Sequence, residues 1–128
     1  MNVKVLLVDD NKNFIKAFKH LILSVFSERI SVIDEAYNGS EAIDLIESKH
    51  AYDIVFLDID MPGKNGYEVA RYINRHYPYV KIVAVSWHEE LEVFTKMFSA
   101  GAYSFIVKDK LNLTLIEKAF YSIKGFRL

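Results

Sequence analysis

The chain has 128 residues, of which 52% are hydrophobic and 26% are charged, and its formal net charge is −1 with a sequence pI near 6.4. This composition is typical of one globular domain with a buried core, and it excludes the basic surface that nucleic-acid-binding domains carry. The chain has no cysteine, which excludes disulfides and thiolate metal sites, and no apolar run long enough to cross a membrane or to form a signal-peptide core. We therefore expect residues 1–128 to be a single domain of a cytoplasmic protein, with no direct binding to nucleic acid or membrane.

Short apolar runs rich in β-branched residues alternate along the chain with longer segments of helical spacing. The runs that predict strands cover residues 3–8, 30–37, 54–57, 80–85 and 103–107. The segments that predict helices follow the runs in turn and cover residues 14–25, 42–46, 67–73, 91–98 and 111–123. Gly101 stands just after the fourth helical segment, where a left-handed residue would end a helix.

Five strands that alternate with five helices predict an α/β fold. The strands would form a parallel, doubly wound sheet, because right-handed crossovers place the intervening helices on both of its faces. The near-continuous apolar character of the strands agrees with this arrangement, since such strands are buried on both sides.

Ionic or hydroxyl side chains follow four of the five predicted strands. Asp9 and Asp10 follow the first strand, Asp58 and Asp60 the third, Ser86 the fourth and Lys108 the fifth. Each residue alone has a plainer interpretation, because Asp and Ser are common helix N-caps and a single lysine is usually solvated. Sites in open α/β sheets form at the carboxyl ends of strands, so the joint pattern predicts one functional site at that edge.

The predicted cluster of acids favours a bound cation. Two carboxylates about 4 Å apart repel by roughly 4 kcal/mol at an effective dielectric of about 20, so three on one edge would hold a proton or a cation. An all-oxygen site suits magnesium, whereas zinc would take His or Cys ligands. The histidines lack ligand spacing and are interpreted as surface or partly buried residues; they are His20, His50, His76 and His88. A carboxylate beside magnesium, faced by a lysine and a hydroxyl, is an arrangement for phosphoryl transfer.

Four segments resemble the motifs of response regulator receiver domains of two-component signalling. They are Leu7-Val8-Asp9-Asp10, the run Phe56-Leu57-Asp58-Ile59-Asp60-Met61-Pro62-Gly63-Lys64-Asn65-Gly66, the run Val83-Ala84-Val85-Ser86, and Gly101-Ala102 with Phe105-Ile106-Val107-Lys108. The resemblance spans residues 3–125 and is specific because order and spacing match together. It implies a flavodoxin-like fold with strand order 2-1-3-4-5, and with two helices on one face of the sheet and three on the other.

The resemblance also implies how the acids work. Asp58 would accept a phosphoryl group from a phosphohistidine of a sensor histidine kinase. Asp10, Asp58 and the backbone carbonyl of Asp60 would bind Mg²⁺, and Asp9 would contribute through water. The domain would catalyse its own phosphorylation and dephosphorylation, and it would not be a turnover enzyme.

The remaining site residues would, by the same resemblance, respond to the phosphoryl group. Ser86 would form a hydrogen bond with it and Lys108 would pair with it. Ser86 and Phe105 would then switch the surface formed by the fourth helix, the fifth strand and the fifth helix. That surface would be the natural contact for a homodimer formed on phosphorylation or for an output domain.

Two positions depart from the family's usual pattern. Lys108 is followed by Asp109 where the family usually has proline, and Lys-Asp resembles regulators with a LuxR-type helix-turn-helix domain, which would lie outside this chain. Because a non-proline cis peptide costs roughly 2.5–4 kcal/mol, we expect a trans bond between these two residues. Trp87 replaces a small residue, and its ring would narrow access to the phosphorylation pocket or spread over the fourth helix.

Other functions fit parts of the pattern. Asp58-x-Asp60 after a strand resembles haloacid-dehalogenase-type phosphatases, but that family needs the motif on its first strand and a second acid pair late in the chain. A pseudo-receiver, which acts as an unphosphorylated interaction module, is supported by Trp87 alone. A flavodoxin would need a hydroxyl- and glycine-rich loop after the first strand, where Asp9-Asp10 has the wrong charge for a phosphate. We therefore favour the receiver function.

Overall fold

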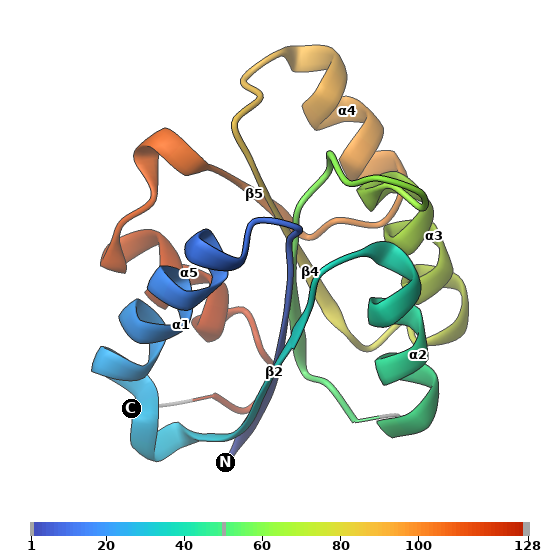
Figure 1. Ribbon diagram of the computed structural model, residues 1–128. Coiled ribbons are helices and arrows are strands. Elements are labelled where there is room, and N and C mark those ends of the chain that lie inside the picture. Colours follow the sequence, from blue (N-terminus) through green and yellow to red (C-terminus); the bar gives the residue numbers. More distant parts are fainter. Residues whose placement is uncertain (1, 50, 127–128) are drawn as a thin grey trace.

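One sheet of five parallel strands forms the centre of the fold (Figure 1). The structure is a computed structural model, and it describes residues 2–49 and 51–126. The strands are β1 (Val3–Val8), β2 (Ile30–Ala36), β3 (Ile54–Leu57), β4 (Lys81–Ser86) and β5 (Ser104–Val107). Their order is β2-β1-β3-β4-β5, and every neighbouring pair is parallel, which confirms the predicted sheet.

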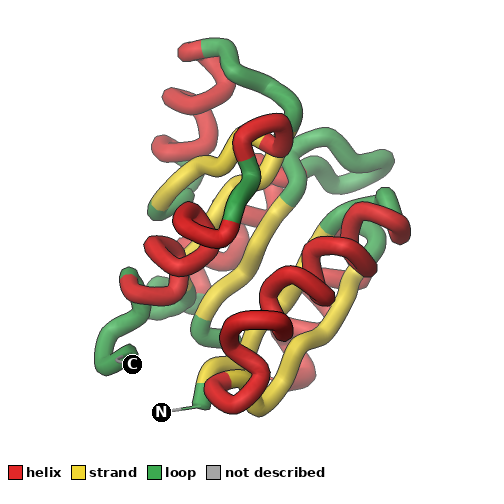
Figure 2. Tube along the Cα trace, turned by 90° about the vertical axis from the view of Figure 1, so that its left-hand side faces the viewer, coloured by secondary structure: helices red, strands yellow, loops and turns green. Residues whose placement is uncertain are grey.

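Five α-helices cover the two faces of this sheet. They are α1 (Lys12–Phe26), α2 (Gly39–Lys49), α3 (Gly66–His76), α4 (Leu91–Ser99) and α5 (Leu113–Tyr121). In Figure 1, α1 and α5 lie on one side and α2, α3 and α4 on the other, as predicted. Figure 2 views the sheet from the α1 and α5 side, with both helices in front of the strands. Within the described residues, no helix has the length and apolar character that crossing a membrane requires.

Two separate apolar clusters fill the space between the sheet and its helices. Neighbouring residues of a strand point to opposite faces, so each strand supplies side chains to both clusters. On the α1 and α5 side, Phe26 and Phe120 stack with ring centroids 4.6 Å apart. On the opposite side, α4 buries only Met97, fewer side chains than any of the other four helices. α4 is therefore the helix held least firmly by the core.

The last helix is shorter than the sequence prediction of residues 111–123. A short 3₁₀ turn, η2 (Lys108–Lys110), follows β5, and α5 begins only at Leu113. Asn112 explains this start, because its side-chain oxygen accepts a hydrogen bond from the N–H of Leu115 at 2.9 Å, as an N-cap does. The apolar spacing included Leu111 in the helix, although this residue packs against the core from the preceding turn.

Gly101 has the positive φ expected of a residue that ends a helix, +115°. A side chain at this position would lie 2.6 Å from the Cβ of Asn74, so the end of α4 approaches α3 closely here. All peptide bonds among the described residues are trans, including the bond between Lys108 and Asp109, as predicted. A second 3₁₀ turn, η1 (Ser27–Arg29), joins α1 to β2.

Two asparagine caps fix the loops that follow β1 and β3. The side chain of Asn11 accepts a hydrogen bond from the N–H of Phe14 at 3.0 Å and begins α1. Asn65 accepts one from the N–H of Glu68 at 3.1 Å and begins α3. Each cap satisfies a backbone N–H that would otherwise lack a partner in the first turn. The residues between strand and helix are thereby held in one conformation at the carboxyl edge of the sheet.

Gly66, the first residue of α3, provides a test of how tightly this edge is built. A Cβ at this position would lie 2.4 Å from the backbone oxygen of Asp58 and 2.7 Å from the Cα of Ile59. Because both neighbours are backbone atoms, we expect Gly66→Ala to lower the free energy of unfolding by about 1–3 kcal/mol in urea denaturation. Gly63→Asn is the control, since nothing lies within 4 Å of its Cβ position and asparagine tolerates its φ of +77°. Equal stability of the Gly66→Ala variant and the wild type would contradict this packing.

Candidate functional site

Three carboxylates meet where β1 and β3 end. One oxygen each of Asp9, Asp10 and Asp58 lies within 4.8 Å of the others. The sheet brings them together because Val8 and Leu57, the last residues of two adjacent strands, are register partners. The N–H of Asp58 also donates to the carbonyl of Val8 at 2.9 Å. Asp9 and Asp58 are buried, whereas Asp10 is exposed.

Lys108 supplies a positive charge to this cluster. Its Nζ lies 2.7 Å from Asp9 Oδ2 and 3.8 Å from Asp58 Oδ1, and only 4% of its side chain is exposed. The ammonium group also lies 4.3 Å from the centroid of the Phe14 ring, which attracts it through its negative face. The usual solvated position of a lysine is therefore excluded here. β5 delivers Lys108 to the acids from the far side of β4.

The electrostatics of the cluster act mainly on Asp58. Burial, and after it the charge of Asp9, raises the pKa of the Asp58 carboxyl to about 7, while Lys108 opposes the rise and Asp10 adds to it. One ammonium group thus compensates only part of the negative charge of three carboxylates. A site with this excess favours a proton or a cation, and each would relieve the same repulsion.

The oxygens present fit a magnesium ion. The three clustered ligand atoms are all carboxylate oxygens, and no histidine of the described residues joins them. Mg²⁺ prefers oxygen ligands and retains several bound waters. Because Asp10 is exposed, there is room for these waters beside it. His20 and His76 are exposed as predicted, and His50 lies outside the described residues.

Asp60 and Ser86 flank the cluster, and neither side chain forms a hydrogen bond with Asp58, although the charge of Asp60 adds to the rise in the pKa of Asp58. The exposed side chain of Asp60 turns to His88, with 2.5 Å between Asp60 Oδ2 and His88 Nε2. This hydrogen bond holds the pKa of His88 above its usual range. The hydroxyl of Ser86 is buried and accepts a hydrogen bond from the N–H of His88 at 3.3 Å. That Ser86 faces Asp58, and that the carbonyl of Asp60 is a ligand, therefore remain predictions.

Two residues of this region had no predicted role. Phe14 was assigned to the apolar face of its helix, and that spacing gives no sign that its ring covers Lys108. His88 was interpreted as a surface residue, although it joins the loop after β3 to the loop after β4.

Trp87 is 61% exposed, and its ring centroid lies 5.7 Å from Lys108 Nζ, which places it beside the site.

Comparison with known families gives a match over most of the chain. Residues 5–120 match the model of the family described as response regulator receiver domain. A curated relative is the transcriptional regulatory protein DegU of Brevibacillus brevis, which is 28% identical over 115 residues, 90% of this chain and 48% of the relative. The chain thus spans about half the length of this relative.

Solved structures share the fold over nearly the whole chain. The receiver domain of the response regulator NarL from Mycobacterium tuberculosis superposes with a TM-score of 0.84 at 27% identity, and 98% of each chain is covered. CheY from Borrelia burgdorferi, solved in a complex with CheX, BeF₃ and Mg²⁺, gives a TM-score of 0.83 at 27% identity. In that comparison 94% of this chain and 87% of the other are covered.

The raised pKa of Asp58 predicts a distinct dependence of stability on pH. Its carboxyl titrates near pH 7 when folded and near its ordinary pKa of about 3.9 when unfolded. Between these values the folded state retains a proton that the unfolded state has lost, so this group's contribution to stability falls as pH rises from about 4 to about 7 and is constant above.

We therefore expect Asp58→Asn, without metal, to be more stable than the wild type at pH 8 by more than about 1 kcal/mol, and to approach it near pH 4. Urea denaturation across this range measures the difference. A difference that does not change with pH would place the pKa of Asp58 near its ordinary value. Added Mg²⁺ should stabilise the wild type more than the variant, because the ion binds to the carboxylates of the folded state and the variant lacks one of them.

Proposed function

This chain belongs to the family of response regulator receiver domains, and from that premise we propose that Asp58 is its phosphoacceptor. The observation that supports the proposal is the buried Asp58 carboxyl, crowded by Asp9 and Asp10 and reached by only one cation, Lys108, among the described residues. A receiver domain is in general not a turnover enzyme, and here the acceptor is a residue of the chain itself. We propose that residues 1–128 form one such domain.

The transfer begins from the ionised form of Asp58. One carboxylate oxygen attacks the phosphorus, a new P–O bond forms, and the bond between phosphorus and the donor breaks. The donor leaves with its electron pair, as the imidazole of a phosphohistidine or as acetate from acetyl phosphate. The phosphoryl oxygens gain negative charge as this happens, so nearby cations lower the barrier. A raised pKa also makes the acceptor oxygen more basic than an ordinary carboxylate.

We propose that Asp10, Asp58 and the backbone carbonyl of Asp60 hold the Mg²⁺ ion, with Asp9 reaching it through water. The bound ion would supply positive charge to the phosphoryl oxygens and would permit Asp58 to ionise near neutral pH. The oxygens of the three side chains fit this ion, as their clustering within 4.8 Å indicates.

Lys108 has a second role after transfer. It lies nearer to Asp9 than to Asp58 before transfer, at 2.7 Å against 3.8 Å. A phosphoryl group adds about −1.5 to −2 charges on the Asp58 side, so the ammonium group shifts toward it. The Ser86 hydroxyl, which now accepts from the N–H of His88, can turn and donate to a phosphoryl oxygen.

We propose that this local change reaches the surface of α4, β5 and α5 through Phe105. The ring of Phe105 is partly buried and contacts Phe94 of α4, with centroids 4.4 Å apart. A hollow of about 220 Å³ beside it, between β5 and α5, gives the ring or a partner side chain room to move. Because α4 buries only Met97, a shift of Phe105 can displace this helix at small cost.

The partners follow from the family and remain proposals. A sensor histidine kinase would donate the phosphoryl group in the cytoplasm, where response regulators typically work. The match to DegU, named as a transcriptional regulatory protein, supports an output domain outside this chain that regulates transcription. The Lys108-Asp109 pair points to the LuxR type, and we propose that phosphorylation promotes a homodimer. The phosphatase alternative is not favoured, because the family match covers residues 5–120. The pseudo-receiver is not favoured either, because the family match is to phosphoacceptor receiver domains and the acids and Lys108 lie together.

The first test is labelling of Asp58. Wild-type protein incubated with acetyl phosphate and Mg²⁺ should gain one phosphoryl group, seen by intact mass, and Asp58→Asn should gain none. Asp109→Asn is the control, since Asp109 is an exposed acid next to Lys108 without a proposed role. Labelling of Asp58→Asn to the wild-type level would move the acceptor to another residue.

The second test concerns the metal. We expect Asp10→Ala to weaken Mg²⁺ binding at least about tenfold, which corresponds to about 1.4 kcal/mol, because it removes one direct carboxylate ligand. Trp87, the only tryptophan of the chain, reports binding through its fluorescence, since its ring lies 5.7 Å from Lys108 Nζ. Labelling should also stop when the protein is treated with a chelator. Phosphorylation at an unchanged rate without metal would exclude the magnesium role.

The third test concerns switching. CheY from Borrelia burgdorferi was solved with BeF₃ and Mg²⁺, and beryllofluoride mimics a phosphoryl group on an acid. Adding both to this protein should change its association state in sedimentation, the fluorescence of Trp87, or both. Phe105→Ala should uncouple the association state from beryllofluoride while Trp87 still responds. If neither signal changes in the wild type, this surface does not carry the phosphorylation state.

A further inference from the structure

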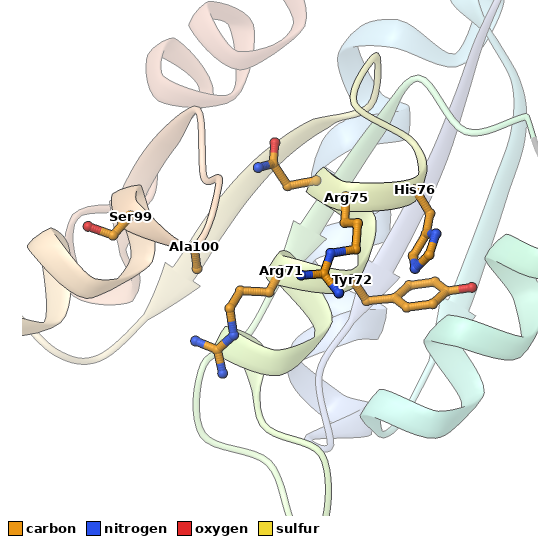
Figure 3. A pocket seen from close by; sticks show the side chains of 7 residues that line it. Arg71, Tyr72, Arg75, His76, Ser99 and Ala100 are labelled. Atoms are coloured by element: carbon orange, nitrogen blue, oxygen red, sulfur yellow. The ribbon is translucent and has the colours of Figure 1, made fainter.

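A basic groove of about 580 Å³ lies between α3 and the end of α4 (Figure 3). Residues of both helices line it: Arg71, Tyr72, Asn74, Arg75, His76, Ser99 and Ala100. α3 begins beside Asp58 at Gly66, so the groove lies along the helix toward the opposite end of the sheet. It is separate from the phosphoacceptor and takes no part in the chemistry proposed above.

The two arginines of the groove have no ion-pair partner among the described residues. The lining of the groove contains no carboxylate, and neither Arg71 nor Arg75 makes a ring contact with a described residue. Other surface cations do have partners, since Lys49 pairs with Asp34 at 2.9 Å and Lys110 with Glu89 at 2.9 Å.

The end of α3 explains only part of the groove's positive charge. Arg75 and His76 lie in the last turn, where cations offset the negative end of the helix dipole. Arg71 lies more than a turn before the helix end, and this effect decays within the last turn. Two arginines four residues apart also repel each other, so the pair is unfavourable until an anion binds.

The walls of the groove are held in place. Asn74 of α3 lies against Gly101, the residue that follows α4. A Cβ added at Gly101 would lie 2.6 Å from the Cβ of Asn74, so α3 and the end of α4 fit closely together. The rings of Tyr72 and His76 pack with centroids 4.5 Å apart. Figure 3 shows Arg71 and Arg75 between Ser99 and Ala100 on one side and Tyr72 and His76 on the other.

We propose that the groove is a docking site for an acidic helix of a partner protein, whose carboxylates four residues apart pair with Arg71 and Arg75. Residues four apart on any α-helix have side chains about 5–6 Å apart at Cβ, so two helices laid side by side match carboxylate to guanidinium twice. Each guanidinium can hold a carboxylate through two parallel hydrogen bonds. The Asn74 amide and the Ser99 hydroxyl add neutral hydrogen-bonding groups at the border.

A partner surface fits this groove better than a small ligand does. Small-molecule sites usually enclose most of their ligand between apolar walls. Here Arg71, Asn74, Arg75, His76 and Ser99 are all exposed, so a small anion would remain largely in water. Exposed arginines are instead enriched where proteins meet proteins.

The experiment uses two helical peptides, both alanine-based and each with two glutamates. One has glutamates four residues apart and the other two residues apart, which places them on different faces of the helix. Amide shifts of ¹⁵N-labelled protein are followed by NMR at about 0.15 M salt, where distant charges are screened. The first peptide should shift the amides of α3 and the end of α4, and the second should bind at least about tenfold more weakly.

Charge reversal tests the arginines directly. The double variant Arg71→Glu with Arg75→Glu should bind the first peptide at least about tenfold more weakly than the wild type. The matched control, Lys16→Glu with Lys118→Glu, changes the net charge equally at two other exposed cations and should bind as the wild type does. Replacing both arginines by lysine should give an intermediate loss, because lysine keeps the charge but not the paired hydrogen bonds.

The outcomes separate this proposal from the phosphoacceptor function. The double arginine variant should retain its circular dichroism spectrum and its labelling at Asp58 by acetyl phosphate. Equal binding of the two peptides, equal binding by the wild type and the charge-reversed protein, or shifts confined to α1 would overturn the docking site. If inorganic pyrophosphate binds in the groove more tightly than the first peptide, the groove serves small phosphate compounds and the helix proposal is wrong.

Discussion

The buried ion pair between Lys108 and Asp9, with 2.7 Å between Nζ and Oδ2, is the contact on which the site depends. It connects β5 to β1, two strands that β3 and β4 separate in the sheet. A lysine with 4% of its side chain exposed is costly unless an anion compensates it, and a carboxylate in that position is equally costly without a cation. The pair therefore ties the ends of distant strands together, and Asp58 lies next to it with its pKa raised to about 7.

Much of this arrangement could be predicted from the sequence because it follows from alternation. Once five strands alternate with five helices, the residues that follow the strands must meet at one edge, and Asp9, Asp58 and Lys108 do so. The sequence could not predict which of the loops at that edge contact one another. The bond between Asp60 and His88 depends on how two loops curve toward each other, and no spacing in the chain encodes that curvature.

Contacts that depend on the orientation of a helix against the sheet could not be predicted from the sequence either. Helical spacing placed Phe14 on an apolar face, but the position of its ring over Lys108 depends on the angle of α1 against the sheet. Arg71 and Arg75 can be seen to share a face of α3, whereas the approach of Ser99 from α4 cannot. The sequence prediction began α5 at Leu111 because it followed the apolar spacing. Asparagine is a common N-cap, so Asn112 could have indicated the later start that the structure shows. Contacts within one element are thus more predictable than contacts between elements.

The weak attachment of α4 has a consequence for how this protein can evolve. A helix with one fully buried side chain, Met97, accepts changes at its exposed positions without loss of folding. Leu91 and Phe98 are exposed, at 77% and 48%, so their replacement changes recognition and leaves the core intact. After a gene duplication, two copies could acquire different partners through α4 while both keep the same acids and lysine. Insulation between parallel signalling pathways would then require few substitutions, all of them on a surface where mutation carries little risk to the fold.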